Sequence, residues 1–292
     1  MTLGKPAPGG ATVAPGLHFV ATPIGAARDI TLRALDILAG ADVLAAEDTR
    51  TLRHLMEIHG VALGGRPLIA YHDHNGEAVR PRLIGLLKQG KSVAYASEAG
   101  TPLVADPGFQ LGRAAIAAGL PVLAAPGPSA VLCALTVSGL PSDRFLFAGF
   151  LPARSAARKS ALAELAAVQS SLIVYETARR LPASLKDMQD VLGDDRQAAV
   201  CRELTKRYEE VTRGTLAELT EIFAAREVKG EIVVVIDRPA PAEASAETLE
   251  AALGRAMATQ SLKDAVAAVA RELKLPKRDV YQKALALGGD EG

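Results

Sequence analysis

The sequence predicts an α/β protein with two α/β domains and a small C-terminal helical module. Short apolar runs alternate with segments in which apolar residues recur at helical spacing, the pattern of βαβ units. The chain has 292 residues, a length that suits about two domains. A Pro- and Ala-rich break near residue 240 separates the last apolar run from a C-terminal segment with a purely helical pattern.

Nine apolar runs are predicted to be β-strands. Several lack the polar alternation of a strand with one solvated face, so we expect them to be buried on both faces. Such strands form parallel or mixed sheets covered by helices. The predicted strands are residues 17–21, 43–46, 68–71, 92–96, 121–124, 145–149, 172–175, 198–201 and 232–236.

Helices are predicted between the strands, most clearly at residues 31–38, 78–87 and 161–168. Asp29 and Ser160 are predicted N-caps, because short polar side chains accept hydrogen bonds from first-turn N–H groups. In the C-terminal segment, Ser261 is predicted to cap a helix that ends near residue 274. Pro276 then opens a second helix that ends near residue 287.

Proline and glycine predict the domain boundaries. Pro126, Gly127 and Pro128 follow the fifth predicted strand and stiffen the chain, so we expect them to join the two α/β domains. Two structures fit the C-terminal module equally well. One is a helix-turn-helix, and the other is a helical hairpin that docks on the core or on a partner. The predicted division is a flexible tail at 1–15, α/β domains at 16–125 and 126–238, a linker at 239–245 and the helical module at 246–288.

Composition narrows the class of protein. The 33 Lys and Arg residues balance the 33 Asp and Glu residues, so any contact with nucleic acid must come from local basic patches. Cys133 and Cys201 are far apart and in apolar surroundings, as in a reduced cytosolic protein. The first residues lack a signal-peptide pattern, and prolines interrupt the most apolar stretch. We therefore predict a cytoplasmic protein without a membrane span.

Residues 85–92 match the phosphate-loop pattern letter for letter. A working phosphate loop leaves a strand and opens a helix, so that backbone N–H groups face the phosphates. Here the order is reversed, because the glycines end a predicted helix and Ser92 begins a strand. The sequence therefore argues against nucleotide hydrolysis at this motif.

Four loops rich in small or rigid residues follow predicted strands, at residues 22–25, 97–102, 126–130 and 175–176. Open α/β sheets bind ligands at the carboxyl ends of their strands. Gly and Pro let the backbone approach a ligand without side-chain obstruction. Plain turn chemistry explains any one of these loops, but their recurrence at strand ends favours a ligand site.

These loops and their spacing resemble the tetrapyrrole methylase superfamily over residues 17–237. Within it, the chain is most similar to the ribosomal small-subunit RNA methyltransferase I family. The segments that carry this resemblance are VATPIG and DITLRAL within 20–35, AAEDTRTLRHL at 45–55, GTPLVADPG at 100–108 and RELTKRYEEVTRGTL at 202–216. The C-terminal segment also resembles the helical extension of that family.

The resemblance implies a cofactor cleft between the two α/β domains that holds S-adenosylmethionine, and it implies a homodimer. The implied activity is 2′-O-ribose methylation of a cytidine in small-subunit (16S) ribosomal RNA, either as free RNA or in the assembled subunit. The implied cofactor-binding residues are Pro23, Ile24, Gly25, Ser97, Glu98, Ala99, Gly100, Thr101, Pro126, Gly127, Pro128, Ser129, Ala130, Tyr175, Glu176, Gly230, Glu231 and Ile232.

Two positions depart from the family pattern. Ala26 stands where the family usually has Asn, and Glu98 stands where it usually has Asp. If the carboxylate of Glu98 binds the ligand directly, the local geometry must adjust, because the Glu side chain is longer than that of Asp. If only the backbone binds, the change matters little.

A ribose hydroxyl is a weak nucleophile at neutral pH, so a nearby proton acceptor would assist the transfer. Candidates for this acceptor are Glu47, Asp48, His72 and His74. The residues predicted to be catalytic are Asp48, His72 and Lys206. No metal is predicted, although His72 and His74 form a His-x-His pair, because the implied reaction needs none. The predicted RNA-binding residues are Arg50, His74, Arg154, Arg158 and Lys159.

Two other functions stay open at this point. One is methylation of a tetrapyrrole or another small molecule in the same cleft. The other is a noncatalytic RNA-binding assembly protein. The EDTR and YHDHN segments at 47–50 and 71–75, together with the C-terminal helices, favour the RNA methyltransferase.

Overall fold

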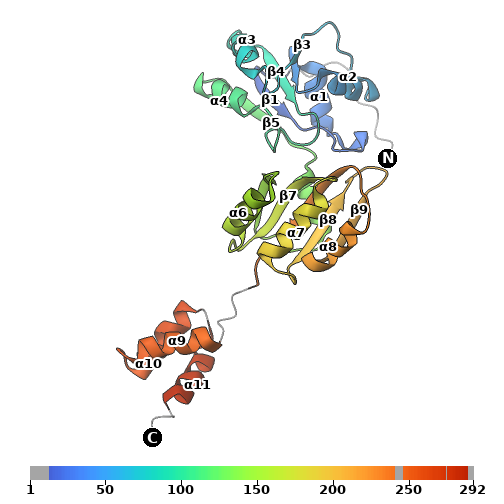
Figure 1. The fold of residues 1–292 in the computed structure, drawn as a ribbon. Coiled ribbons are helices and arrows are strands. Elements are labelled where there is room, and N and C mark those ends of the chain that lie inside the picture. Colours follow the sequence, from blue (N-terminus) through green and yellow to red (C-terminus); the bar gives the residue numbers. More distant parts are fainter. Residues whose placement is uncertain (1–12, 241–245, 274, 289–292) are drawn as a thin grey trace, which may run out of the picture. The chain divides into compact units, whose positions relative to one another are not determined.

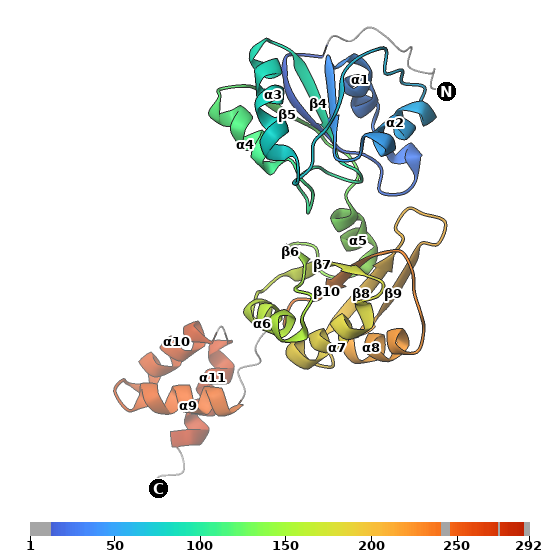
Figure 2. The ribbon, with the colours of Figure 1, turned by 45° about the horizontal axis from the view of Figure 1, so that its top comes forward.

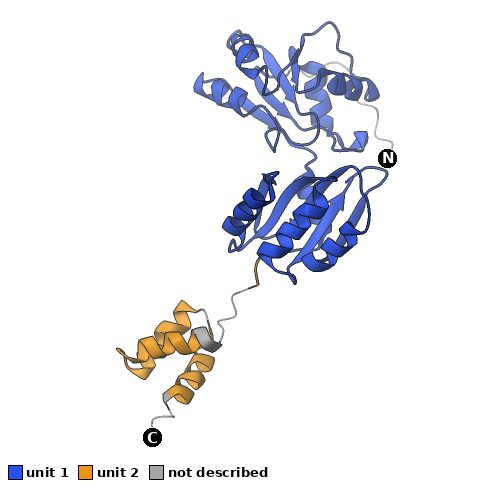
Figure 3. Cartoon of the chain, in the orientation of Figure 1, with its two compact units in different colours: residues 1–238 blue, residues 239–292 orange. Residues whose placement is uncertain are grey.

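The computed structural model describes residues 13–240, 246–273 and 275–288. It contains two α/β parts, each built on one five-stranded sheet, followed by a helical unit (Figure 1). The chain divides into two compact units, residues 1–238 and 239–292 (Figure 3). The predicted α/β class is confirmed. Most of the predicted tail at 1–15 and most of the predicted linker at 239–245 lie outside the described residues.

The first sheet is fully parallel, with strand order β3-β2-β4-β1-β5. Every residue of β1, β2 and β4 is buried, since helices cover both faces. One face packs on α1 and α2 through Leu38 and Met56, and the other on α3 and α4 through Leu83 and Leu111. The elements are β1 (Gly16–Val20), α1 (Leu32–Gly40), β2 (Val43–Ala46), α2 (Thr49–Ile58), β3 (Leu68–Ala70), α3 (Gly76–Lys88), β4 (Ser92–Ala96), α4 (Phe109–Ala117) and β5 (Val122–Ala125).

The second sheet is mixed, with strand order β6-β7-β10-β8-β9. The strands β6 and β7 are parallel, and the other neighbours are antiparallel. The helix α5 packs on one face (Figure 2), whereas α6, α7 and α8 cover the other. The elements are α5 (Ala130–Ser138), β6 (Phe145–Phe150), α6 (Ser155–Leu165), β7 (Ser171–Thr177), α7 (Leu181–Leu192), β8 (Gln197–Arg202), β9 (Glu210–Thr215), α8 (Leu216–Ala224) and β10 (Glu231–Ile236).

The structure corrects several local predictions. The strand β9 was not predicted, because its sequence EVTRGT is largely polar and it lies at the sheet edge. The N-cap of α1 is Thr31, whose hydroxyl accepts from the Ala34 N–H, and not Asp29. Ser160 lies inside α6, which begins at Ser155. The inverted phosphate-loop context is confirmed, because α3 ends at Lys88 and β4 begins at Ser92.

The C-terminal unit has three helices with a common apolar core: α9 (Ala246–Met257), α10 (Leu262–Glu272) and α11 (Lys277–Gly288). The sequence interpretation missed α9. Ser261 caps α10 as predicted, because its side chain accepts a hydrogen bond from the Asp264 N–H. In the parts of the chain that the structure describes, no helix has the length and apolar character needed to span a membrane.

Candidate functional site

Three of the four strand-end loops are tied together by hydrogen bonds. Thr22 and Gly100 exchange backbone bonds of 2.9 and 3.0 Å, which join the loop after β1 to the loop after β4. The Thr101 hydroxyl donates to the Pro128 carbonyl at 2.9 Å and joins the loop after β5. Gly127 packs so closely on Ala21 that a Cβ there would lie 2.9 Å from the alanine methyl. The small residues therefore allow the loops to meet.

A cavity of about 300 Å³ lies beside these loops, within the size range of small-molecule sites. Its wall is mostly apolar and includes Ile24, Phe150 and Tyr175. Cys201 lies in the wall, and burial raises the pKa of its thiol to about 12, so the thiol stays neutral. The Tyr175 ring makes edge contacts with Phe147 and Phe150, with ring centroids 4.8 and 5.5 Å apart. The site can therefore hold a ring system against an apolar wall.

Eleven of the residues that the family resemblance implies for cofactor binding line this cavity: Ile24, Ala99, Gly100, Thr101, Ser129, Ala130, Tyr175, Glu176, Gly230, Glu231 and Ile232. The remaining seven do not line it: Pro23, Gly25, Ser97, Glu98, Pro126, Gly127 and Pro128. Glu98 is exposed, whereas its neighbours Ala99 and Gly100 form the wall. The structure therefore favours backbone contact at this loop, and the departure at Glu98 need not alter the cavity.

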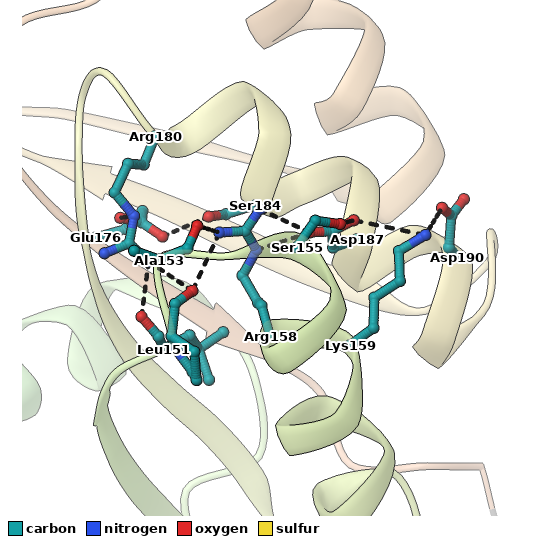
Figure 4. Close-up of polar contacts among 11 residues, drawn as sticks. Leu151, Ala153, Ser155, Arg158, Lys159, Glu176, Arg180, Ser184, Asp187 and Asp190 are labelled. Atoms are coloured by element: carbon teal, nitrogen blue, oxygen red, sulfur yellow. Dashed lines mark hydrogen bonds and ion pairs between the residues drawn. The ribbon is translucent and has the colours of Figure 1, made fainter.

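Glu176 lies at the cavity, but its carboxylate is engaged with α7 (Figure 4). The carboxylate is fully buried, lies 3.2 Å from Arg180 Nε and accepts a hydrogen bond from the Ser184 hydroxyl. It also accepts from the Thr177 N–H at 2.8 Å. Because these partners occupy both oxygens, Glu176 shapes the end of β7 and is not free to bind a ligand through its carboxylate.

Asp48, a predicted catalytic residue, is the N-cap of α2 and does not line the cavity. Its carboxylate accepts from the Arg50 N–H at 2.7 Å and pairs with Arg50 Nη2 at 2.8 Å. Hydrogen bonds from Arg50 lower the pKa of Asp48 to about 2. A carboxylate with so low a proton affinity is a weak base at neutral pH, which argues against the predicted role.

His72 and Lys206, the other two predicted catalytic residues, also lie outside the cavity wall. His72 Nδ1 is buried without a hydrogen-bond partner among the described residues. Lys206 Nζ lies 3.0 Å from both Glu203 Oε1 and Glu231 Oε2. Burial lowers the pKa of Lys206, but the hydrogen bonds with these carboxylates raise it above its ordinary value overall. Lys206 therefore stays protonated and cannot serve as a base.

Of the predicted RNA-binding residues, Arg158 requires a correction. It is 3% exposed, and Arg158 Nη2 lies 2.6 Å from Asp187 Oδ2 (Figure 4). Arg158 is thus part of a buried ion pair and does not reach the surface to bind RNA. Arg50, His74 and Arg154 are exposed, and the half-exposed Lys159 pairs with Asp190 at 2.7 Å.

Four carboxylates whose charges act on one another are called the acidic rim: Glu47, Asp73, Glu98 and Asp106. Burial raises the pKa of Glu47, and the charges of Glu98 and Asp73 add to the effect. Burial and then the charge of Glu47 raise the pKa of Asp106 to about 6. Asp106 lines the cavity, and the sequence interpretation missed it. The available signal was a charged residue within the Gly- and Pro-rich segment GTPLVADPG.

The chain is similar to known proteins over most of its length. A family model described as Tetrapyrrole (Corrin/Porphyrin) Methylases matches residues 16–220, and one described as RsmI C-terminal HTH domain matches residues 242–288. A protein of Vibrio cholerae named ribosomal RNA small subunit methyltransferase I is 42% identical over 98% of each chain. One of the same name from Mesorhizobium japonicum is 52% identical over 80% of this chain and 78% of its own.

Solved structures of the same fold have low sequence identity to this chain. A uroporphyrin-III C-methyltransferase from Thermus thermophilus, complexed with S-adenyl homocysteine, superposes with a TM-score of 0.54 at 18% identity. The match covers 76% of this chain and 97% of that one. A diphthine synthase superposes with a TM-score of 0.59 at 18% identity, over 76% of this chain and 89% of its own.

Proposed function

Because the chain belongs to the ribosomal RNA small subunit methyltransferase I family, within the tetrapyrrole methylases, we propose that it transfers a methyl group from S-adenosylmethionine to RNA. The acceptor is the 2′-hydroxyl of a cytidine in small-subunit ribosomal RNA. The observation that carries the proposal is the cavity at the joined strand-end loops, in a chain that also carries the C-terminal domain of this family.

The residues around the cavity fit S-adenosylmethionine. An apolar wall with Phe150 and Tyr175 suits an adenine ring, and the small residues Ala99, Gly100 and Ala130 leave the backbone accessible. Asp106 Oδ2 and Ser97 Oγ are buried without a hydrogen-bond partner among the described residues. When bound, the cofactor supplies an electrophilic methyl group on a positively charged sulfur. We assign the cofactor site to the two α/β domains, and we place the boundary between these domains near residue 125.

The work of the protein in this reaction is alignment. Methyl transfer requires the acceptor oxygen, the methyl carbon and the sulfur to lie in line, and a well-oriented pair of reactants gains a large rate advantage. Hydrogen bonds of Thr22, Gly100 and Thr101 tie together the loops that form one wall of the cavity, while Tyr175 and Ile232 supply another wall. We assign three exposed residues to the surface that binds RNA: Arg50, His74 and Arg154.

The decisive experiment supplies labelled S-adenosylmethionine and small ribosomal subunits that lack the modification. We expect label in the ribosomal RNA, and nucleoside mass spectrometry should locate it in 2′-O-methylcytidine. Free ribosomal RNA tested in parallel separates the two forms of the substrate. Label in a different nucleoside would overturn the proposal, as would label in a tetrapyrrole offered in a parallel reaction when none enters the RNA. Cofactor binding without any methyl transfer would point to a noncatalytic assembly protein.

We also propose that the protein is a cytoplasmic homodimer, as the family resemblance implies. Phe109 and Ile116 are seven residues apart on one face of α4, and they are 59% and 66% exposed. Large apolar side chains on one helix face favour burial in an interface. Light scattering on the full chain should give twice the mass of 30.4 kDa. A monomer mass across the working concentration range would exclude the dimer.

A further inference from the structure

Three carboxylate residues line the cavity, and they differ in what they contact. The Glu176 carboxylate is buried against Arg180 and Ser184. Glu231 Oε2 lies 3.0 Å from Lys206 Nζ. Asp106 Oδ2 is buried and has no hydrogen-bond partner among the described residues. Buried polar groups are normally paired, so an unpaired oxygen on a residue of the cavity wall indicates a partner that arrives with the ligand.

The backbone around Asp106 is held in an uncommon conformation. Leu103 and Ala105 have φ angles of 72° and 60°, in the left-handed region that residues with a side chain rarely adopt. Gly108, at φ 118°, is the N-cap of α4, and a Cβ there would lie 3.0 to 3.2 Å from Leu103, Tyr95 and Phe19. Strained backbone of this kind persists where the surroundings fix it, and it clusters at functional sites. The loop thus holds Asp106 at the cavity wall.

The charged and titratable groups around Asp106 are mostly acidic. Glu47 follows β2, Glu98 follows β4, and the phenols of Tyr95 and Tyr175 extend from β4 and β7. Burial is the main cause that raises the pKa of Asp106 to about 6, and the charges of Glu47 and Glu98 add to it. The Ser97 hydroxyl lies near enough to lower this pKa, but it does not reach hydrogen-bond geometry with Asp106. At neutral pH the carboxylate is therefore ionised but has a higher proton affinity than an ordinary aspartate, which suits a general base.

We propose that Asp106 is the proton acceptor for the attacking ribose hydroxyl, an inference that rests on the proposed function. The ribose oxygen forms a bond to the transferred methyl carbon. The bond between that carbon and the sulfur of the donor breaks, and its electron pair stays on sulfur. The hydroxyl proton passes to a carboxylate oxygen of Asp106. Atoms and charges balance without a further reactant.

The test compares Asp106→Asn with the wild type in two measurements. Binding of S-adenosylhomocysteine, measured by calorimetry, should be retained, whereas the single-turnover methylation rate should fall by about 10²- to 10⁴-fold, the usual contribution of a general base. In the wild type, the rate should fall as pH drops below about 6, because Asp106 must be ionised to accept a proton. In Asp106→Asn this acid limb should disappear.

Two further variants separate a base from a structural residue. Glu47→Gln removes the charge that raises the proton affinity of Asp106, so the acid limb should move to lower pH. Asp36→Asn removes an exposed carboxylate on α1 that lies outside the cavity wall and outside the acidic rim, and its rate should stay close to that of the wild type. If Asp106→Asn does not fold, the wild-type pH profile and its shift in Glu47→Gln still decide the question.

The outcomes are distinct. An unchanged rate or an unchanged acid limb in Asp106→Asn, or a wild-type rate that is flat between pH 5 and 8, would overturn the assignment and leave the methyltransferase proposal standing. A loss of cofactor affinity that accounts for the whole loss of rate would make Asp106 a cofactor ligand instead. If the wild type does not methylate ribosomal RNA at all, the proposed function and this inference fail together.

Discussion

Replacement of Arg158 by alanine is expected to lower the free energy of unfolding by about 3–5 kcal/mol, because it leaves the carboxylate of Asp187 buried without its main cation. Arg158 Nε donates to Asp187 Oδ2 at 2.8 Å, and Arg158 Nη1 donates to the carbonyl of Ala153 at 3.1 Å. The Ser155 hydroxyl, at 2.8 Å, and the Lys159 ammonium, at 3.5 Å, remain as partners of Asp187 in the variant. Urea unfolding at pH 7, followed by circular dichroism, measures the loss.

Lys159 provides the matched control, since it is the next residue along α6 and also carries a positive charge. Its side chain is 40% exposed and pairs mainly with Asp190, at 2.7 Å, while the longer contact with Asp187 is 3.5 Å. Exposed ion pairs contribute little to stability, so Lys159→Ala should unfold at a urea concentration close to that of the wild type. A second control, Arg158→Met with Asp187→Leu, removes both charges and should recover much of the lost stability.

The same variants decide whether Arg158 binds RNA. Because Arg158 is part of a buried ion pair, Arg158→Ala should lower the affinity for RNA only to the extent that it unfolds the protein. If Arg158→Ala remained as stable as the wild type while its affinity for ribosomal RNA fell, the buried ion pair would not describe the residue in solution. The sequence does hold a sign of burial. Arg158, Leu162 and Leu165 recur at helical spacing, and Leu162 is fully buried.

The scaffold was more predictable than its polar contacts. The strands β1, β2 and β4 are short continuous apolar runs bounded by turn residues, a pattern that depends only on local sequence. The strand β9 escaped prediction because its residues EVTRGT carry no apolar run, and it is held by pairing with β8. The helix α9 lies inside the predicted helical module at 246–288, but only the two helices marked by Ser261 and Pro276 were identified there.

The site shows the same limit at the level of single side chains. Gly and Pro at strand ends identified the loops, and eleven implied residues line the cavity. The direction of a side chain depends on partners far along the chain, which spacing does not reveal. Arg158 meets Asp187, 29 residues away, and the Ala26 N–H donates to Thr205, 179 residues away. Asp106 was overlooked because its raised pKa depends on burial and on Glu47, both consequences of the fold.

Gly100→Val is expected to weaken binding of S-adenosylhomocysteine by about tenfold or more, equivalent to about 1.4 kcal/mol. Gly100 has φ 82°, a conformation that a β-branched residue adopts only with strain. A Cβ at this position would lie 3.3 Å from Ile24 Cγ2, and both residues line the cavity. Hydrogen bonds with Thr22 hold both the N–H and the carbonyl of Gly100, so the backbone cannot shift without breaking them. The added side chain must therefore displace Ile24 or enter the cavity.

Gly119→Val separates the effect of backbone strain from the effect on the cavity. Gly119 has φ 69°, and a Cβ there would meet no atom within 4 Å. Both variants should lower the melting temperature, since strain of this kind costs about 1–3 kcal/mol. The loss of affinity in calorimetry should belong to Gly100→Val alone, because Gly119 lies outside the cavity wall. If Gly100→Val bound the cofactor product as tightly as Gly119→Val, the cavity at the joined loops would not be the cofactor site. The assignment of Asp106, which depends on that cavity, would fall with it.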